Sequence, residues 1–111
     1  MEEMIQTICE AIRDRNLVSF TVVDPITSVL IRQVTDAEPY AVYFRRDFNQ
    51  MWGLFCVPDS AFDEAEPLDF ALETIRDLSR SDRTFEDSRQ ICRLKIPPES
   101  QFIQVRCRIQ I

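Results

Sequence analysis

The cysteines are the first residues in this sequence whose chemistry has to be considered. Cys9, Cys56, Cys92 and Cys107 are spread along the chain, no two of them have CxxC spacing, and the chain contains no histidine. A zinc site built from all four thiolates would lack the paired spacing that structural sites use. Each cysteine falls on an apolar position of its local pattern. We therefore expect four small buried hydrophobic side chains and no metal site.

The residues needed for most enzymatic schemes are also missing. Without histidine there is no Ser–His or Cys–His pair. The single glycine, Gly53, leaves no phosphate-binding loop and no dinucleotide fingerprint. Nineteen acidic residues are present, but no spacing singles out a carboxylate pair. The sequence predicts a protein that is not an enzyme and that uses no cofactor.

Positive charge is concentrated at the C-terminal end of the sequence. Residues 89–111 carry five basic side chains and one acidic side chain, whereas residues 1–88 carry eight basic and eighteen acidic ones, and the net charge is −6. In the runs QICRLKI (90–96) and IQVRCRIQI (103–111), apolar residues alternate with polar ones, as in half-buried strands. If the two runs pair as neighbouring strands, one face of the pair carries Arg93, Lys95, Arg106 and Arg108.

Such a basic face predicts contacts with a phosphate backbone. Two alternatives stay open. The face is an ordinary solvated strand surface, or it pairs with the acidic segment 58–69 within one chain or across a dimer. The negative total charge argues against a general nucleic-acid binder, because the field of the whole molecule would repel the polymer.

The remaining patterns predict the elements that position these side chains. Apolar residues at helical spacing predict an amphipathic helix over 4–15, with Asn16 as its C-terminal cap. Four β-rich runs follow, at 17–23, 28–34, 39–46 and 51–57. Residues 68–76 fit a helix or a strand equally well.

This order of elements predicts a mainly β fold with an N-terminal α-helix. Short runs with hairpin-like spacing favour a small barrel or a strongly bent sheet, and the runs 90–96 and 103–111 predict a C-terminal β-hairpin. No apolar run is long enough for a membrane span, and the acidic start MEEMIQ does not resemble a secretory signal. We expect a cytoplasmic protein.

The order of four segments is suggestive: EAIRDRNLVSFTV, AEPYAVYFRRDFNQMWGLF, DFALETIRDL and SDRTFE. Together they cover about residues 5–86, and the ordered set resembles the WYL domain of bacterial regulators. Tyr40 matches the proline–tyrosine of that family, and Trp52 and Leu54 match two of its three namesake residues. Gly53 stands where the family has its tyrosine.

The next family stretch is matched only in its apolar positions. Phe70, Leu72 and Ile75 agree with the family pattern. Its two arginine positions are Ala71 and Thr74 in this chain, and its aspartate is Glu73. In the family those arginines belong to a basic cluster that holds an anionic ligand, commonly nucleic acid or a nucleotide. The scaffold positions are therefore retained, whereas the charged ligand positions are largely changed.

The resemblance implies a small Sm-like or SH3-like barrel with an N-terminal helix, and a strand over 69–74. It implies a WYL-like domain over 1–88. Residues 89–111 are then either a basic hairpin packed on that domain or the start of a truncated C-terminal domain.

The function that the resemblance implies is a non-catalytic regulatory or accessory module. Such a module senses a nucleic-acid or nucleotide ligand and controls transcription or an antiviral defence system. The candidates for anion contact are Arg32, Arg45, Arg46 and Arg76, with Tyr40 for stacking. The alternative is a protein-interaction or homodimerisation module whose ligand site has degenerated. The changed positions 71 and 74 and exposed β-edges favour that alternative.

Overall fold

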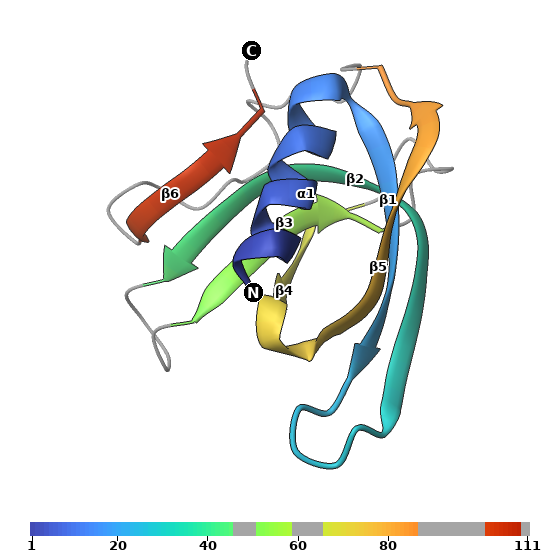
Figure 1. Cartoon of the computed structure of the whole chain (residues 1–111), viewed down its shortest axis with the longest axis vertical. Helices are drawn as coiled ribbons and strands as arrows, with labels where there is room; N and C mark the ends of the chain where they lie inside the picture. Colours follow the sequence, from blue (N-terminus) through green and yellow to red (C-terminus); the bar gives the residue numbers. More distant parts are fainter. Residues whose placement is uncertain (46–50, 59–65, 87–101, 110–111) are drawn as a thin grey trace.

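The computed structural model describes residues 1–45, 51–58, 66–86 and 102–109, with only the backbone described at 45 and 102–104 (Figure 1). The fold is mainly β with one N-terminal helix, as predicted. The elements are α1 (Glu2–Asp14), β1 (Asn16–Val23), β2 (Leu30–Arg45), β3 (Trp52–Val57), β4 (Leu68–Ala71), the 3₁₀ turn η1 (Leu72–Thr74), β5 (Ile75–Thr84) and β6 (Phe102–Arg108).

All six strands belong to one antiparallel sheet in the order β4-β3-β2-β1-β5, with β6 added on β2. The long strand β2 pairs with β1 through residues 30–37 and with β3 through residues 38–44. Residues 41–45 also pair with β6. Along residues 38–44 of β2, one edge is occupied by β3. Strand β6 therefore pairs with the opposite edge, which is the edge that β1 occupies along residues 30–37. Two groups of strands thus share β2, and the sheet bends around the core (Figure 1).

The sheet is not closed into a barrel, so the expected Sm-like or SH3-like barrel is wrong in this respect. The other expectation, a strongly bent sheet, is the one observed. Strands β4 and β5 are joined by the single turn η1, and β4 pairs with β3 while β5 pairs with β1. In the described part of the chain no ladder joins β4 to β5.

Helix α1 covers one side of the bent sheet (Figure 1). Its inward stripe of Ile5, Ile8 and Ile12 is buried, as the apolar spacing predicts. The C-terminal cap of the helix is Arg15, which adopts a left-handed conformation (φ 59°, ψ 34°) and donates its N–H to carbonyls of the last turn. The predicted cap, Asn16, is instead the first residue of β1.

The predicted strands 28–34 and 39–46 form one continuous strand, because the segment TDAE between them makes a bulge and not a turn. The register with β1 slips between the pairs Val18–Ala37 and Phe20–Val34. Asp36 takes up the extra residue at φ 55°, and its N–H donates to the Ser19 hydroxyl at 3.0 Å.

Residues 68–76 combine the two patterns that the sequence left open. The expected strand over 69–74 is correct for the β4 residues and wrong for 72–74, which form η1. The sequence did not predict β5 beyond residue 76, because Ile75 is its only buried side chain and apolar residues do not alternate along it.

The core lies between α1 and the sheet and is rich in aromatic side chains. Phe20 and Phe70 meet edge to face with ring centroids 5.4 Å apart. The predicted strand 90–96 lies outside the described residues, so the expected hairpin partner of β6 is not observed. Within the described ranges, no helix is long and apolar enough to cross a membrane.

Candidate functional site

Tyr40, predicted to stack on a ligand, belongs to the core. Its side chain is 0% exposed, and its hydroxyl donates a hydrogen bond of 2.5 Å to the buried carboxylate of Glu38. Its ring meets Phe85 edge to face at 5.7 Å. A ring covered in this way offers no face to a base, so the predicted stacking role does not fit this arrangement.

The four arginines predicted to contact an anion do not converge in the described part of the chain. Arg32 and Arg45 lie near opposite ends of β2, and Arg46 lies outside the described residues. Arg76 is exposed at the start of β5, where its guanidinium donates to the carbonyls of Glu73 (2.7 Å) and Ile75 (3.0 Å). Its role there is to cap the backbone at η1.

Of the predicted basic face, Arg93 and Lys95 lie outside the described residues, and Arg106 is engaged within the molecule. Both terminal nitrogens of Arg106 donate to the carboxylate of Glu2, one of them at 3.0 Å. Its guanidinium also lies 5.7 Å from the centroid of the Trp52 ring. The hydrogen bond from Arg106 holds the pKa of Glu2 below its ordinary value. Arg106 therefore ties β6 to the start of α1.

Two cysteines that were predicted to be separate buried side chains form a disulfide. Cys9 of α1 and Cys107 of β6 are joined across 98 positions of sequence, with Cα atoms 5.8 Å apart. Both residues are half-buried. Cys56 fits the prediction, since it is a buried free thiol whose pKa is raised by burial. Cys92 lies outside the described residues.

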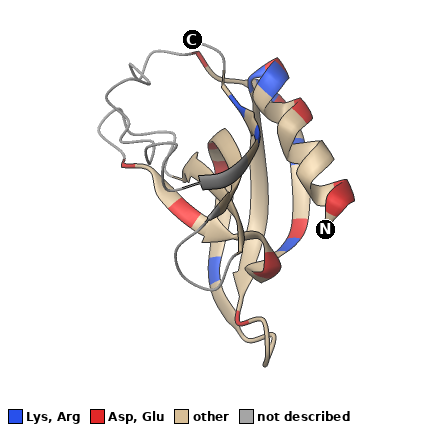
Figure 2. Ribbon diagram, turned by 90° about the vertical axis from the view of Figure 1, so that its left-hand side faces the viewer, with Lys and Arg blue, Asp and Glu red and all other residues tan. Residues whose placement is uncertain are grey.

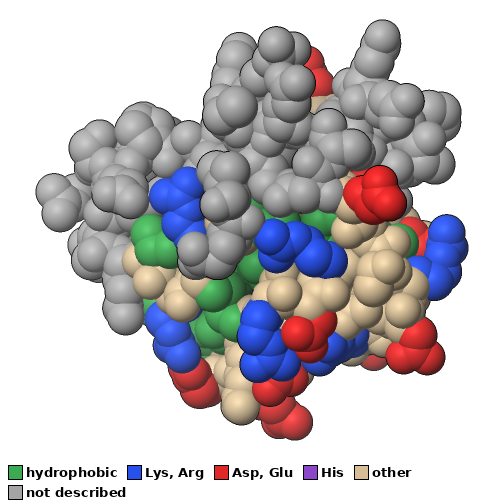
Figure 3. All heavy atoms as spheres, turned by 90° about the horizontal axis from the view of Figure 1, so that it is seen from above, with side chains coloured by type: hydrophobic (Ala, Val, Ile, Leu, Met, Phe, Trp, Pro, Cys, Tyr) green, Lys and Arg blue, Asp and Glu red, His purple; other side chains and the backbone are tan. Residues whose placement is uncertain are grey.

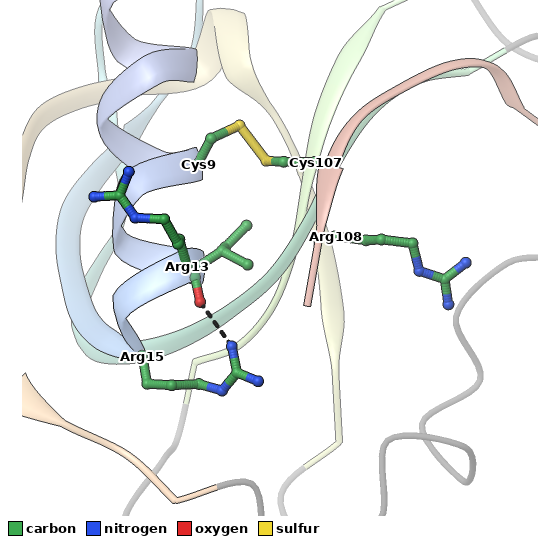
Figure 4. Close-up of a pocket in the computed structure, with 6 residues that line it drawn as sticks. Cys9, Arg13, Arg15, Cys107 and Arg108 are labelled. Carbon is green, nitrogen blue, oxygen red and sulfur yellow. Dashed lines mark hydrogen bonds between the residues drawn. A yellow bond between two sulfur atoms is a disulfide. The ribbon is translucent and has the colours of Figure 1, made fainter. Parts of the chain in front are cut away.

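A cavity of about 330 Å³ opens beside this disulfide (Figure 4). Its lining consists of Cys9, Ile12, Arg13, Arg15, Cys107 and Arg108. Figure 4 shows that the first two arginines leave the end of α1, while Arg108 extends from the end of β6 on the other side of the bridge. Three arginine residues thus contribute to the lining of this space, and none of its described lining residues carries a carboxylate.

Neighbouring groups hold Arg13 and Arg15 in place. Arg15 donates to the Ile12 carbonyl at 3.1 Å (dashed in Figure 4), and Arg13 pairs with Asp14 at 3.0 Å. The first turn of α1 is acidic, whereas its last turn carries both Arg13 and Asp14 (Figure 2). Figure 3 looks onto the end of the molecule where basic side chains border an apolar area. The sequence does not single out Arg13 and Arg15, because only the fold brings them and Arg108 to the same cavity.

The tip of the β1–β2 hairpin is a second unusual surface, and it projects from the body of the molecule (Figure 1). Ile26 is 92% exposed, and Val29, Leu30 and Ile31 are each more than 60% exposed. The turn itself is well ordered by Asp24, whose carboxylate accepts hydrogen bonds of 2.9 Å from the N–H groups of Ile26 and Thr27. These bonds hold the pKa of Asp24 below its usual range.

Next to this tip, one edge of β2 has no partner strand among the described residues. Residues 30–37 pair with β1 on one edge, and β3 begins on the other edge only at Glu38. An edge of this kind presents backbone N–H and C=O groups that can accept another strand. An apolar tip and an open strand edge therefore occur together.

Comparison with protein-family models, with curated proteins and with solved structures found no match for this chain. Across the described ranges, no three Cys, Asp or Glu side chains gather closely enough to hold a metal ion.

Proposed function

We propose that this chain is a non-catalytic accessory or regulatory module that acts by binding, and that it associates with a second copy of itself through the β1–β2 hairpin. The observation that carries the proposal is the exposure of four apolar side chains at the tip: Ile26, Val29, Leu30 and Ile31. Contiguous exposed apolar residues are typical of interaction sites. Burying each one contributes about 1.5–3 kcal/mol, which is needed to offset the cost of association.

The open edge of β2 supports a symmetric arrangement. Two identical edges that run antiparallel about a two-fold axis are self-complementary, because each contact then occurs twice. Antiparallel pairing through residues 30–37 would place each hairpin tip beside the far end of the partner's paired segment, so that each tip contacts the other copy. Backbone hydrogen bonds would add to the affinity, as in other cases of strand addition.

The test is the oligomeric state across a concentration series, measured by sedimentation velocity and light scattering. We expect the unmodified chain to form a dimer as its concentration rises and the variant Ile26→Ser/Ile31→Ser to stay monomeric. Leu68→Ser is the matched control, because Leu68 is also an exposed apolar side chain but lies in β4. An unmodified chain that is monomeric at every concentration would contradict the proposal.

A second candidate function is WYL-like sensing of a nucleic acid or nucleotide in transcription control or antiviral defence. What favours it is the arginine-lined cavity formed by Arg13, Arg15 and Arg108. Arginine forks suit phosphate groups. Both candidate functions assume a cytoplasmic setting.

This second function predicts salt-dependent binding of labelled single-stranded oligonucleotides and nucleotides. The affinity should fall in Arg13→Gln/Arg108→Gln and stay unchanged in Arg83→Gln, since Arg83 lies in β5 and pairs with Asp36. Absence of binding at low salt would rule this function out.

A further inference from the structure

We propose that the cavity beside the Cys9–Cys107 bridge is a reaction site for small anionic thiols, which enter it and exchange with the disulfide. This inference is independent of the self-association through the hairpin. It combines three observations on one small volume: a disulfide, a cavity that reaches both of its cysteines, and a lining that carries positive charge.

The bridge is accessible in a way that a core disulfide is not. Cys9 and Cys107 are half-buried and both line the cavity of about 330 Å³. This volume is large enough for a thiol of a few heavy atoms. Ile12 supplies an apolar wall on which the carbon chain of such a thiol can pack.

The charge around the bridge favours an anion over a cation. Arg13, Arg15 and Arg108 line the cavity, and none of the lining residues that the structure describes is acidic. The carboxylate of Asp14, next to Arg13, accepts hydrogen bonds from Arg13 and also from Arg80 at 2.5 Å, so two guanidinium groups share it. A positive environment raises the local concentration of anionic reactants. It also stabilises a cysteine thiolate as a leaving group.

The reaction is an ordinary two-step exchange. The incoming thiolate attacks one bridge sulfur, a new S–S bond forms, and the old bond breaks with its electron pair leaving on the other cysteine as a thiolate. A second thiolate then attacks the mixed disulfide. It releases the oxidised form of the small thiol and leaves the second cysteine as a thiolate. Two thiols thus supply the two electrons that reduce the bridge.

The exchange would change how β6 is held. In the oxidised chain β6 is covalently joined to α1 through Cys107. After reduction, the contacts that remain include the ladder with β2, the Arg106–Glu2 pair and the hydrogen bond of 2.8 Å from the Ile109 N–H to the Tyr40 carbonyl. Anionic thiols therefore control whether the last strand is fixed to the first helix.

The test compares three thiols of similar size and different charge: 3-mercaptopropionate, 2-mercaptoethanol and cysteamine. The rate at which each thiolate opens the bridge is measured by rapid alkylation and intact mass, and is divided by its rate toward a small uncharged disulfide. This division removes intrinsic nucleophilicity. We expect the normalised rate of mercaptopropionate to exceed that of cysteamine about tenfold at low salt. The mixed disulfide should map to Cys9 or Cys107.

The preference should disappear in Arg13→Gln/Arg15→Gln/Arg108→Gln and persist in the matched control Arg83→Gln, which removes a charge from β5. In the unmodified chain, added salt should lower the mercaptopropionate rate and raise the cysteamine rate, and this test needs no variant to fold. Equal normalised rates, a preference unchanged in the triple variant, or Cys9 and Cys107 found as free thiols in air-oxidised protein would each overturn the proposal.

Discussion

Tyr43 and Gly53 face each other directly across the β2–β3 ladder. A Cβ atom placed on Gly53 would lie 3.4 Å from the Tyr43 ring carbons, so this ring already occupies the space above the glycine. The resemblance to WYL domains expects a tyrosine at position 53. Two tyrosines at directly opposed positions would compete for one volume, which gives a steric reason for the glycine here.

Substitutions at Gly53 test this arrangement. Gly53→Ala adds a contact at ordinary van der Waals distance in a backbone conformation that alanine tolerates, and we expect a change in unfolding free energy within about 1 kcal/mol. Gly53→Tyr should destabilise the fold by about 1–3 kcal/mol through overpacking. Urea unfolding measures both. The exchange Tyr43→Gly/Gly53→Tyr, which moves the ring to the other strand, should recover part of the loss.

The Tyr40 hydroxyl gives a second prediction at the residue scale. It donates to the carboxylate of Glu38, and both side chains are buried. Tyr40→Phe removes the donor and leaves a buried carboxylate with one hydrogen bond fewer, so we expect a loss of about 1–3 kcal/mol in unfolding free energy. Denaturant titration of the variant measures it. Stability equal to that of the unmodified chain would show that the bond contributes nothing.

The sequence shows which residues carry charge, but it does not show which of them contact one another. The Arg106–Glu2 pair joins positions 104 residues apart, and the disulfide joins positions 98 apart. No local pattern encodes such a pairing. Tyr40 was misassigned for a related reason: a strand that is buried on both faces shows no alternation to reveal which side chains are inward.

Asp14 connects two elements that are far apart in sequence. Its carboxylate accepts hydrogen bonds from Arg13, next to it at the end of α1, and from Arg80 of β5. Arg80 also donates to the Asn16 side chain at 2.8 Å. The bonds from Arg13 and then Arg80 lower the pKa of Asp14 to about 2. This cluster links the end of the helix to the edge strand.

The depressed pKa predicts how this link responds to acid. Because the folded carboxyl ionises more readily than the unfolded one, its contribution to stability is full above about pH 4 and is lost as the pH falls toward 2. The difference in urea midpoint between the unmodified chain and Asp14→Asn should therefore be constant above pH 5 and vanish near pH 2. Glu66→Gln, which removes an exposed carboxylate, is the control. A difference that does not change with pH would contradict the assignment.

Elements with strong local periodicity were predicted within one or two residues of their observed bounds at most ends, as α1 and β1 show. The errors have specific causes. Asp36 absorbs a bulge where the sequence pattern indicates a turn, and β5 is a mostly exposed edge strand. An edge strand with one buried side chain is held by its ladder with β1, and backbone hydrogen bonds leave no signature in residue type.

At the scale of the whole molecule, the sequence restricted the sheet to a barrel or a strongly bent sheet. Whether the sheet closes into a barrel depends on where β4 and β5 diverge. The single turn η1 sets that point. The long strand β2 takes part in both groups of strands, and this continuity holds the open sheet together.

The disulfide should contribute strongly to global stability because it closes almost the whole chain into one loop. A loop of about 100 residues predicts up to about 4.7 kcal/mol from restricted unfolded conformations, and measured losses are about 2–5 kcal/mol. We expect Cys9→Ser/Cys107→Ser to lose stability in that range in denaturant unfolding without reductant. With reductant, the unmodified chain and the variant should unfold at similar denaturant concentrations. Cys56→Ser is not a suitable control, because Cys56 is fully buried.

The same bridge determines how the molecule responds to mechanical tension. It encloses every strand from β1 to β5 and nearly all of β6 between residues 9 and 107. A force that pulls the two ends of the chain apart therefore passes from α1 to β6 through the disulfide bond. The strand ladders inside the closed loop carry none of this force. Reduction of the bridge transfers the force to the β2–β6 and β1–β2 ladders, so an oxidised chain resists stretching and a reduced chain extends.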